Sequence, residues 1–202
     1  RLLIAPSRVR EIIVDLIEMK LLTLRVENDK LLIEPVDRLK LALYAVQQGA
    51  SLKSVSLCLD WREFEEVCAY AFNVYGYDVH RNFRFKCRGR RFEIDVIGVK
   101  KPLVLCVDCK RWSAGRFSIL HRDAIDHLRK VELLSTCPRA LGRLKVLGWN
   151  EILLLPVMLT VHEDRVKIYD GIPIVPVFKF NSFLSEFEAF IYDLRVVRVK
   201  KN

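Results

Sequence analysis

The chain has 202 residues, a formal net charge of +9 and a sequence pI of about 9.4, and 51% of its residues are hydrophobic. This apolar content excludes wholesale disorder and supports one good-sized domain, with or without a small appendage. No apolar run approaches the roughly 20 residues that cross a bilayer, so a membrane-spanning helix is excluded as well. The excess of cations suits a polyanionic partner such as a nucleic acid, although an anionic membrane surface would also attract it.

The start of the chain and its cysteines suggest where the protein works. The first residue is Arg1 and no charged-then-apolar leader is present, so we expect a soluble, intracellular, nucleoid-associated protein that has lost elements before Arg1. Six cysteines without a secretory signal predict reduced thiols rather than a disulfide framework. Cys106 and Cys109 form a CxxC, but residues three apart in a strand point to opposite faces, so we expect core residues and no metal-thiolate site.

The first 36 residues predict a helix followed by a hairpin. Residues 6–22 carry apolar side chains at helical spacing, with Ser7 as the candidate N-cap. Two short strands then flank Asn28 and Asp29, a pair that favours a tight turn. A helix leading into a hairpin is typical of the second half of a winged helix-turn-helix, so we expect a partial module of this kind over residues 1–36. Such a module either grips DNA or serves as an interaction or dimerisation wing.

A helical linker is expected between this module and the main domain. Residues 37–48 read as a helix that ends at Gly49, and residues 50–59 read as a connector with little periodicity. We therefore predict a linker over residues 37–59, with the domain boundary between Ser56 and Asp60.

The remaining residues, 60–202, predict one α/β domain with a mixed sheet flanked by helices. A helix with Asp60 as its N-cap opens the domain, and strands with turns at Arg88-Gly89 and near Pro102 follow it. The later expected elements are a helix over 121–135, a buried strand over 151–161, a strand with a turn at 170–171, and a closing helix over 183–194.

Basic residues concentrate just before Asp95. The stretch from Arg81 to Arg91 contains six basic residues, no acid and two interleaved phenylalanines. One interpretation is the solvated edge of a hairpin, and the one we favour is a ridge that contacts DNA phosphates. The DNA-binding candidates are Arg81, Arg84, Lys86, Arg88, Arg90 and Arg91, together with Arg111, Arg116 and Arg122 farther along the chain.

Two acids and a lysine stand at the ends of two apolar strands. Alternation places Asp108 and Lys110 on one face of their strand, and the twelve residues between Asp95 and Asp108 are enough for a strand end, a turn and a returning strand. The two carboxylates can then meet at one end of the sheet, where like charges demand a cation. An oxygen-seeking ion such as Mg²⁺ (or Mn²⁺) suits them, with the Cys109 backbone carbonyl as a further ligand. Lys110 can orient an attacking water or stabilise charge on phosphorus, so the set predicts metal-dependent phosphodiester hydrolysis.

A third acid is expected from the helix that opens the domain. Glu63, Glu65 and Glu66 compete for this role. On a helical wheel Glu65 borders the apolar stripe, whereas Glu66 points nearly opposite to it and Glu63 lies well off it. A border residue can reach the edge of the sheet, so Glu65 is the predicted third ligand.

These residues carry a family resemblance. The strands EIDVIG and LVLCVDCKRW resemble the bipartite motif of the PD-(D/E)xK restriction-endonuclease-like nucleases, and REFEEVCAYAFNVYGYDV resembles the first helix of the Mrr-type restriction and archaeal Holliday-junction-resolvase branches. Ile94 replaces the proline of the motif, and Asp108 replaces its more frequent Glu. The resemblance covers about residues 60–180 and implies a restriction-endonuclease-like mixed sheet, a Mg²⁺ cofactor and a DNA substrate. It assigns Glu65, Asp95, Asp108 and Lys110 to the active site.

The expected function is a Mg²⁺-dependent deoxyribonuclease that acts in DNA repair, recombination or restriction. Cleavage of two strands by one fold usually needs two sites, which favours a homodimer. The alternative is an inactive nuclease fold that binds DNA and works through the winged helix. Two weaker hypotheses concern Trp112, which could stack on a base, and His127, which could approach the site but is expected to be exposed on its helix.

Overall fold

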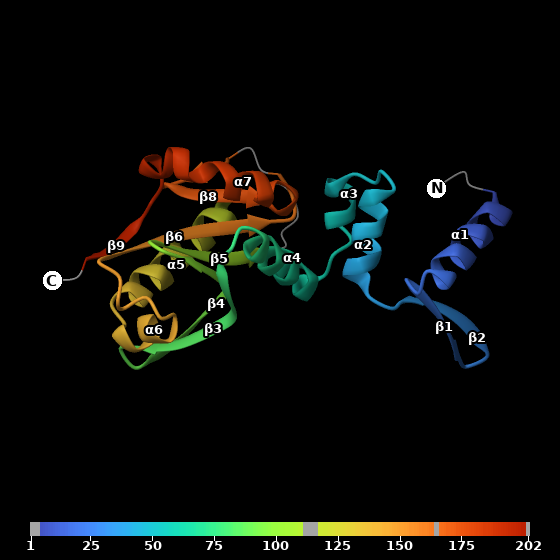
Figure 1. The fold of residues 1–202 in the computed structure, drawn as a ribbon, viewed down its shortest axis with the longest axis horizontal. Coiled ribbons are helices and arrows are strands. Elements are labelled where there is room, and N and C mark those ends of the chain that lie inside the picture. The colour runs from blue at the N-terminus through green and yellow to red at the C-terminus, as the bar shows by residue number, and fades with distance from the viewer. Residues whose placement is uncertain (1–4, 111–116, 164–165, 201–202) are drawn as a thin grey trace. The chain divides into compact units, whose positions relative to one another are not determined.

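A computed structural model describes residues 5–110, 117–163 and 166–200, and these form two compact units, Arg1–Leu59 and Asp60–Asn202. Figure 1 shows the elements in chain order. None of the helices in the described ranges is long and apolar enough to cross a membrane.

The first unit is a helix, a hairpin and two further helices. Asn28 and Asp29 both have positive φ angles, 50° and 58°, which is the conformation of a two-residue type I′ turn. The N-cap of the first helix is Ala5, with proline at the first helical position, so the prediction of a Ser7 cap is wrong. The elements of this unit are α1 (Pro6–Glu18), β1 (Leu22–Glu27), β2 (Lys30–Pro35), α2 (Arg38–Gln47) and α3 (Leu52–Ser56).

The connector expected after Gly49 contains the short helix α3. Ser51 caps it, because its side chain accepts a hydrogen bond of 3.0 Å from the backbone N–H of Ser54. A five-residue helix has too few turns for apolar periodicity to reveal it, which is why the sequence reads as irregular.

The second unit is built on a mixed sheet, as the sequence predicts. The first three strands are antiparallel neighbours, and the central strand β6 runs parallel to both β5 and β8. The sheet order is β3-β4-β5-β6-β8-β7, with β9 paired to the first half of β6 on the same side as β8. The strands are β3 (Asp78–Cys87), β4 (Arg90–Lys100), β5 (Leu103–Lys110), β6 (Glu151–Thr160), β7 (Ile168–Tyr169), β8 (Ile172–Pro176) and β9 (Val197–Lys200).

Helices cover both faces of this sheet. On one face α4 (Trp61–Val74) and α7 (Phe180–Glu186) pack against the central strands, and on the other α5 (Phe117–Ser135) and α6 (Pro138–Arg143) do so (Figure 1). Two segments of 3₁₀-helix flank α7, a single turn at Val177–Lys179 and a longer, kinked segment at Phe187–Asp193. The core therefore has two main layers, one on each side of β4, β5 and β6.

The helix α4 starts where the sequence predicts. The side chain of Asp60 accepts a hydrogen bond of 2.9 Å from the backbone N–H of Glu63, and the Glu63 carboxylate accepts one of 2.6 Å from the backbone N–H of Asp60. This reciprocal capping box fixes the first turn of the helix. It also fixes which face of α4 meets the sheet, with Phe64, Cys68 and Phe72 buried.

Two expectations for this unit need correction. The closing helix is interrupted, because Phe190 leaves helical geometry (φ −124°, ψ 22°) and the chain then enters the strand β9. The thiols are not all reduced, since Cys87 at the end of β3 forms a disulfide with Cys137 just before α6. The residues are fifty positions apart, so composition gave no sign of this pairing. Cys106 and Cys109 are buried free thiols in different core layers, as predicted.

Close packing at Gly98 yields a prediction about stability. A Cβ atom on Gly98 would lie 2.6 Å from the ring of Phe72, and Phe72 is fully buried between Tyr77 and Phe180. We expect Gly98→Ala to lower the free energy of unfolding by about 1–3 kcal/mol, because the ring cannot retreat without strain. Urea unfolding would measure this loss.

Gly148→Ala is the matched control, because a Cβ at Gly148 meets no atom within 4 Å. Adding Phe72→Leu to Gly98→Ala is expected to recover part of the lost stability, as coupled neighbours do. Equal effects of the two glycine substitutions would contradict the steric explanation.

Candidate active site

The pairing of β4 with β5 brings Asp95 next to Asp108. Val96 pairs with Val107 in antiparallel register, so the preceding and following residues face each other at the end of the ladder. The backbone N–H of Cys109 donates a hydrogen bond of 2.7 Å to Asp95 Oδ2. The carboxylate of Asp95 is therefore anchored to the next strand, beside Asp108.

A break in the regular alternation of side chains along β4 sets the direction of the Asp95 side chain. In a regular strand residues two apart share a face, yet Ile94 and Val96 belong to opposite core layers. Opposite Asp95 on β3 stands Asn82, which has a left-handed φ of 49°. The distortion at these two positions leaves Asp95 half-buried between the layers.

Two lysines hold the side chain of Asp108. This carboxylate is only 2% exposed, and its Oδ2 lies 2.9 Å from Lys110 Nζ while its Oδ1 lies 3.3 Å from Lys130 Nζ. Both lysines are only partly exposed, so the ion pairs are shielded from water. The sequence reasoning missed Lys130, which lies on α5 one turn after His127. No local pattern indicated it, because the packing of α5 on the sheet decides which of its side chains reach Asp108.

The two carboxylates have opposite pKa shifts. Burial and the neighbouring Asp108 charge raise the pKa of Asp95 to about 6, well above the ordinary value of an aspartate, although the Cys109 N–H opposes this shift. For Asp108, burial also favours the neutral form, but His127, Lys110 and Lys130 outweigh it and lower the pKa. Burial would lower the pKa of Lys110 as well, yet its pairing with Asp108 raises it. Asp108 is therefore ionised at neutral pH, whereas Asp95 titrates at about pH 6, close to neutrality.

Glu65 is the glutamate of α4 that reaches the site. Its side chain is 3% exposed and its charge contributes to the raised pKa of Asp95. Glu63 is committed to the capping box, and Glu66 is partly exposed with its carboxylate 3.5 Å from Arg81. Glu65 is thus the α4 glutamate whose charge acts on Asp95, and its role as a metal ligand stays a prediction.

The donor chemistry of this site fits a hard divalent cation. Buried carboxylate oxygens of like charge, with the pKa of one raised by the other, are what such an ion relieves. No three His, Cys, Asp or Glu side chains in the described ranges are gathered at metal-binding distance. Lys110 and Lys130 instead occupy both oxygens of Asp108, so a cation would compete with them for this carboxylate.

His127 lies behind the site rather than on the surface. It is fully buried, and its Nε2 is 2.8 Å from the carbonyl oxygen of Cys106. Burial lowers the pKa of this imidazole, despite the opposing charge of Asp108. The expectation of an exposed helix histidine is wrong, because α5 turns this position toward β5.

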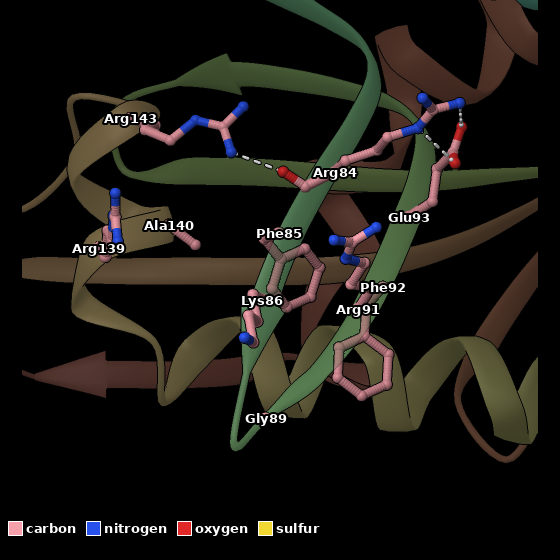
Figure 2. Close-up of a pocket in the computed structure, with 10 residues that line it drawn as sticks. All are labelled: Arg84, Phe85, Lys86, Gly89, Arg91, Phe92, Glu93, Arg139, Ala140 and Arg143. Carbon is pink, nitrogen blue, oxygen red and sulfur yellow. Dashed lines mark hydrogen bonds and ion pairs between the residues drawn. The ribbon is translucent and has the colours of Figure 1, made fainter.

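The basic candidates are distributed over several surfaces. Arg81 pairs with Glu66, and Arg122 is 71% exposed beside Asp123. Arg88 and Arg90 stand at the exposed turn of the hairpin, while Arg111 and Arg116, with Trp112, lie outside the described residues. Three others line a pocket that Figure 2 draws, namely Arg84, Lys86 and Arg91.

This fold and this pairing of acids and lysine define a nuclease-like domain, and residues 57–135 match the family model described as restriction endonuclease. The chain belongs to this restriction endonuclease family. A protein of Archaeoglobus fulgidus, described as uncharacterized, is 30% identical over 137 residues, which are 66% of this chain and 95% of that protein.

Two solved structures are similar at a lower level. A protein of unknown function, AF1548, has 14% identity and a TM-score of 0.32 over 48% of this chain and 46% of its own. The protein VC1899 from Vibrio cholerae has 15% identity and a TM-score of 0.39 over 92% of this chain and 43% of its own. The chain thus spans less than half the length of either protein.

Proposed function

We propose that this chain is a metal-dependent endonuclease that hydrolyses DNA phosphodiester bonds in repair, recombination or restriction. One observation carries the proposal: Asp95 on β4 accepts the backbone N–H of Cys109, which stands between Asp108 and Lys110 on β5, and Lys110 Nζ lies 2.9 Å from Asp108 Oδ2. The family match to a nuclease domain supports the same reaction.

The proposed ligands of Mg²⁺ or Mn²⁺ are Glu65, Asp95, Asp108 and the backbone carbonyl of Cys109. When bound, such an ion activates water and neutralises charge on the scissile phosphate. Asp95 is held in place by the Cys109 N–H, and Asp108 by two lysines. Lys110, whose pKa is raised, keeps its proton and can stabilise the negative charge that develops on the phosphate oxygens.

DNA is the proposed substrate, and a homodimer is the proposed assembly for cutting both strands. The unit over residues 1–59 is proposed as a partial winged helix (1–36) with a helical linker (37–59). Its helix-hairpin order and tight Asn28-Asp29 turn support this assignment.

A second candidate is a DNA-binding protein that does not cut. It is favoured by the lysines on both oxygens of Asp108, which balance the buried charge without a metal. The first candidate cleaves DNA when Mg²⁺ is added and the second does not, so a cleavage assay with metal separates them.

The test is incubation of the chain with labelled duplex, single-stranded, flap and four-way-junction DNA, with Mg²⁺, Mn²⁺ or EDTA. We expect cleavage with either metal, none in EDTA, and loss of cleavage in Asp108→Asn with DNA binding retained. Asp126→Asn, at an exposed carboxylate on α5, is the matched control and is expected to cut normally. Tight binding without cleavage under both metals would favour the non-cutting candidate.

A further inference from the structure

A basic pocket lies along the outer edge of the sheet, away from the catalytic carboxylates. It has a volume of about 1090 Å³ and is lined by the β3–β4 hairpin and by α6 (Figure 2). β3 is the edge strand, so its outer side is free of a neighbouring strand in the described sheet. The Cys87–Cys137 disulfide joins the end of β3 to the start of α6, which ties the two walls together.

The charge of this pocket is almost entirely positive. The single acid, Glu93, is engaged by Arg84 at 2.8 Å. Within the described ranges, Lys86, Arg91 and Arg139 form no ion pair, and all three are exposed. The lining cations are Arg84, Lys86, Arg91, Arg139 and Arg143.

One of these cations is held rigidly in the wall. Arg143 donates a hydrogen bond to the backbone carbonyl of Arg84, and its guanidinium lies 4.5 Å from the ring centroid of Phe83. A cation anchored by its backbone contact and by an aromatic ring loses little side-chain entropy when it meets an anion. Part of the site is therefore built before any ligand arrives.

Aromatic rings also line the pocket. Phe85 and Phe92 have ring centroids 5.5 Å apart and are tilted by 31°. Phe85 is buried in the core, so the half-buried Phe92 is the ring that a base can reach. Aromatic rings beside cations are the usual means of holding single-stranded nucleic acid, because bases stack while phosphates pair with arginine and lysine. The paired bases of a duplex are stacked inside the helix and cannot use such rings.

The pocket is within reach of a strand that passes through the active site. Arg91 is four residues from Asp95 along β4, which corresponds to about 13 Å at about 3.3 Å per residue. That span matches about four nucleotide steps at the 3.4 Å spacing of one DNA strand. A single strand leaving the catalytic carboxylates can therefore reach these cations.

We infer that this pocket binds a single-stranded segment of the DNA substrate. The inference rests on the proposed nuclease function for its link to cleavage, but binding itself does not require catalysis. The cations contact the sugar-phosphate backbone and Phe92 contacts the face of a base, so the binding has no sequence preference. Arg139 and Arg143 are new members of the DNA-binding surface, since they lie on α6, outside the basic stretch that the sequence indicates.

The test is fluorescence anisotropy in EDTA with oligo(dT) of about 15 nucleotides and with a duplex of the same length. We expect Arg91→Ala/Arg139→Ala to weaken single-strand binding by about 10- to 100-fold and to lower the slope of log K against log salt by about 1.4. Duplex binding should change by less than about threefold. Because EDTA prevents cleavage, a failure of the nuclease proposal leaves this measurement unaffected.

Two further variants make the result specific. Phe92→Leu keeps an apolar side chain but removes the ring, and it is expected to weaken single-strand binding about tenfold while duplex binding is unchanged. Arg129→Ala/Arg198→Ala, which removes the same charge from α5 and β9, should leave both affinities within twofold of the unmodified chain, and melting temperatures confirm folding. Equal losses for duplex and single strand, or no loss in the pocket variants, would overturn the inference.

Discussion

Lys110→Met is expected to slow metal-dependent DNA cleavage by about 10²- to 10³-fold, while the affinity for DNA changes little. The substitution keeps the length of an apolar stem but removes the ammonium that lies 2.9 Å from Asp108. Charge that develops on phosphate in the transition state then has no cation at this position. Single-turnover cleavage with saturating enzyme measures the chemical step directly.

Lys130→Met is the comparison that separates the two lysines. Lys130 contacts the other oxygen of Asp108 from the far side, on α5, so its role is to position this carboxylate. We expect a loss of about tenfold because the carboxylate is held less well, and a lower Mg²⁺ concentration for half-maximal rate because the ion no longer competes with this ammonium. A Lys110→Met enzyme that cuts as well as Lys130→Met would contradict the distinct role given to Lys110.

The sequence predicts most of the fold because its local signals agree with the tertiary packing. The N-cap at Asp60, the turns at Asn28-Asp29 and Arg88-Gly89, and the apolar strands are all present in the structure. The misses have physical reasons. The helix α3 is too short for periodicity, and the partner of Cys87 lies fifty residues away.

In the candidate site, too, some residues could be predicted from local sequence and others depend on tertiary packing. Spacing is enough to place Asp95 beside Asp108 and Lys110 on the neighbouring strand, since the register of a hairpin follows from its turn. The break of alternation at Asn82 and Asp95 could not be predicted from spacing. Lys130 and His127 could not be placed in this way, because the angle at which α5 crosses the sheet decides which of its side chains point at Asp108. Arg139 and Arg143 depend likewise on where α6 packs beside β3.

Asp95→Asn is expected to stabilise the metal-free protein at alkaline pH. Since the pKa of Asp95 is raised to about 6 in the folded chain, the native state binds more protons than the unfolded state between about pH 4 and pH 6. Stability therefore falls as the pH rises through this window, and the loss is complete above it. The rise of this pKa from its ordinary value to about 6 corresponds to a loss of at most about 3 kcal/mol in the free energy of unfolding.

Asparagine removes this loss because it carries no charge, and its carbonyl oxygen can still accept the Cys109 N–H. Urea unfolding in EDTA at several pH values should show the variant about 2–3 kcal/mol more stable at pH 8 and equal to the unmodified chain near pH 4. Asp126→Asn, at an exposed carboxylate, should show a small difference with no such pH trend.

Mg²⁺ provides the second half of this experiment. The ion is expected to stabilise the unmodified chain, because it relieves the repulsion between Asp95 and Asp108, and to stabilise Asp95→Asn much less. The variant should also fail to cut DNA. A buried acid that lowers stability without metal, and whose removal abolishes both metal binding and cleavage, is retained for its chemistry rather than for the fold. An unmodified chain more stable than Asp95→Asn at pH 8 in EDTA would show instead that Asp95 is a structural residue.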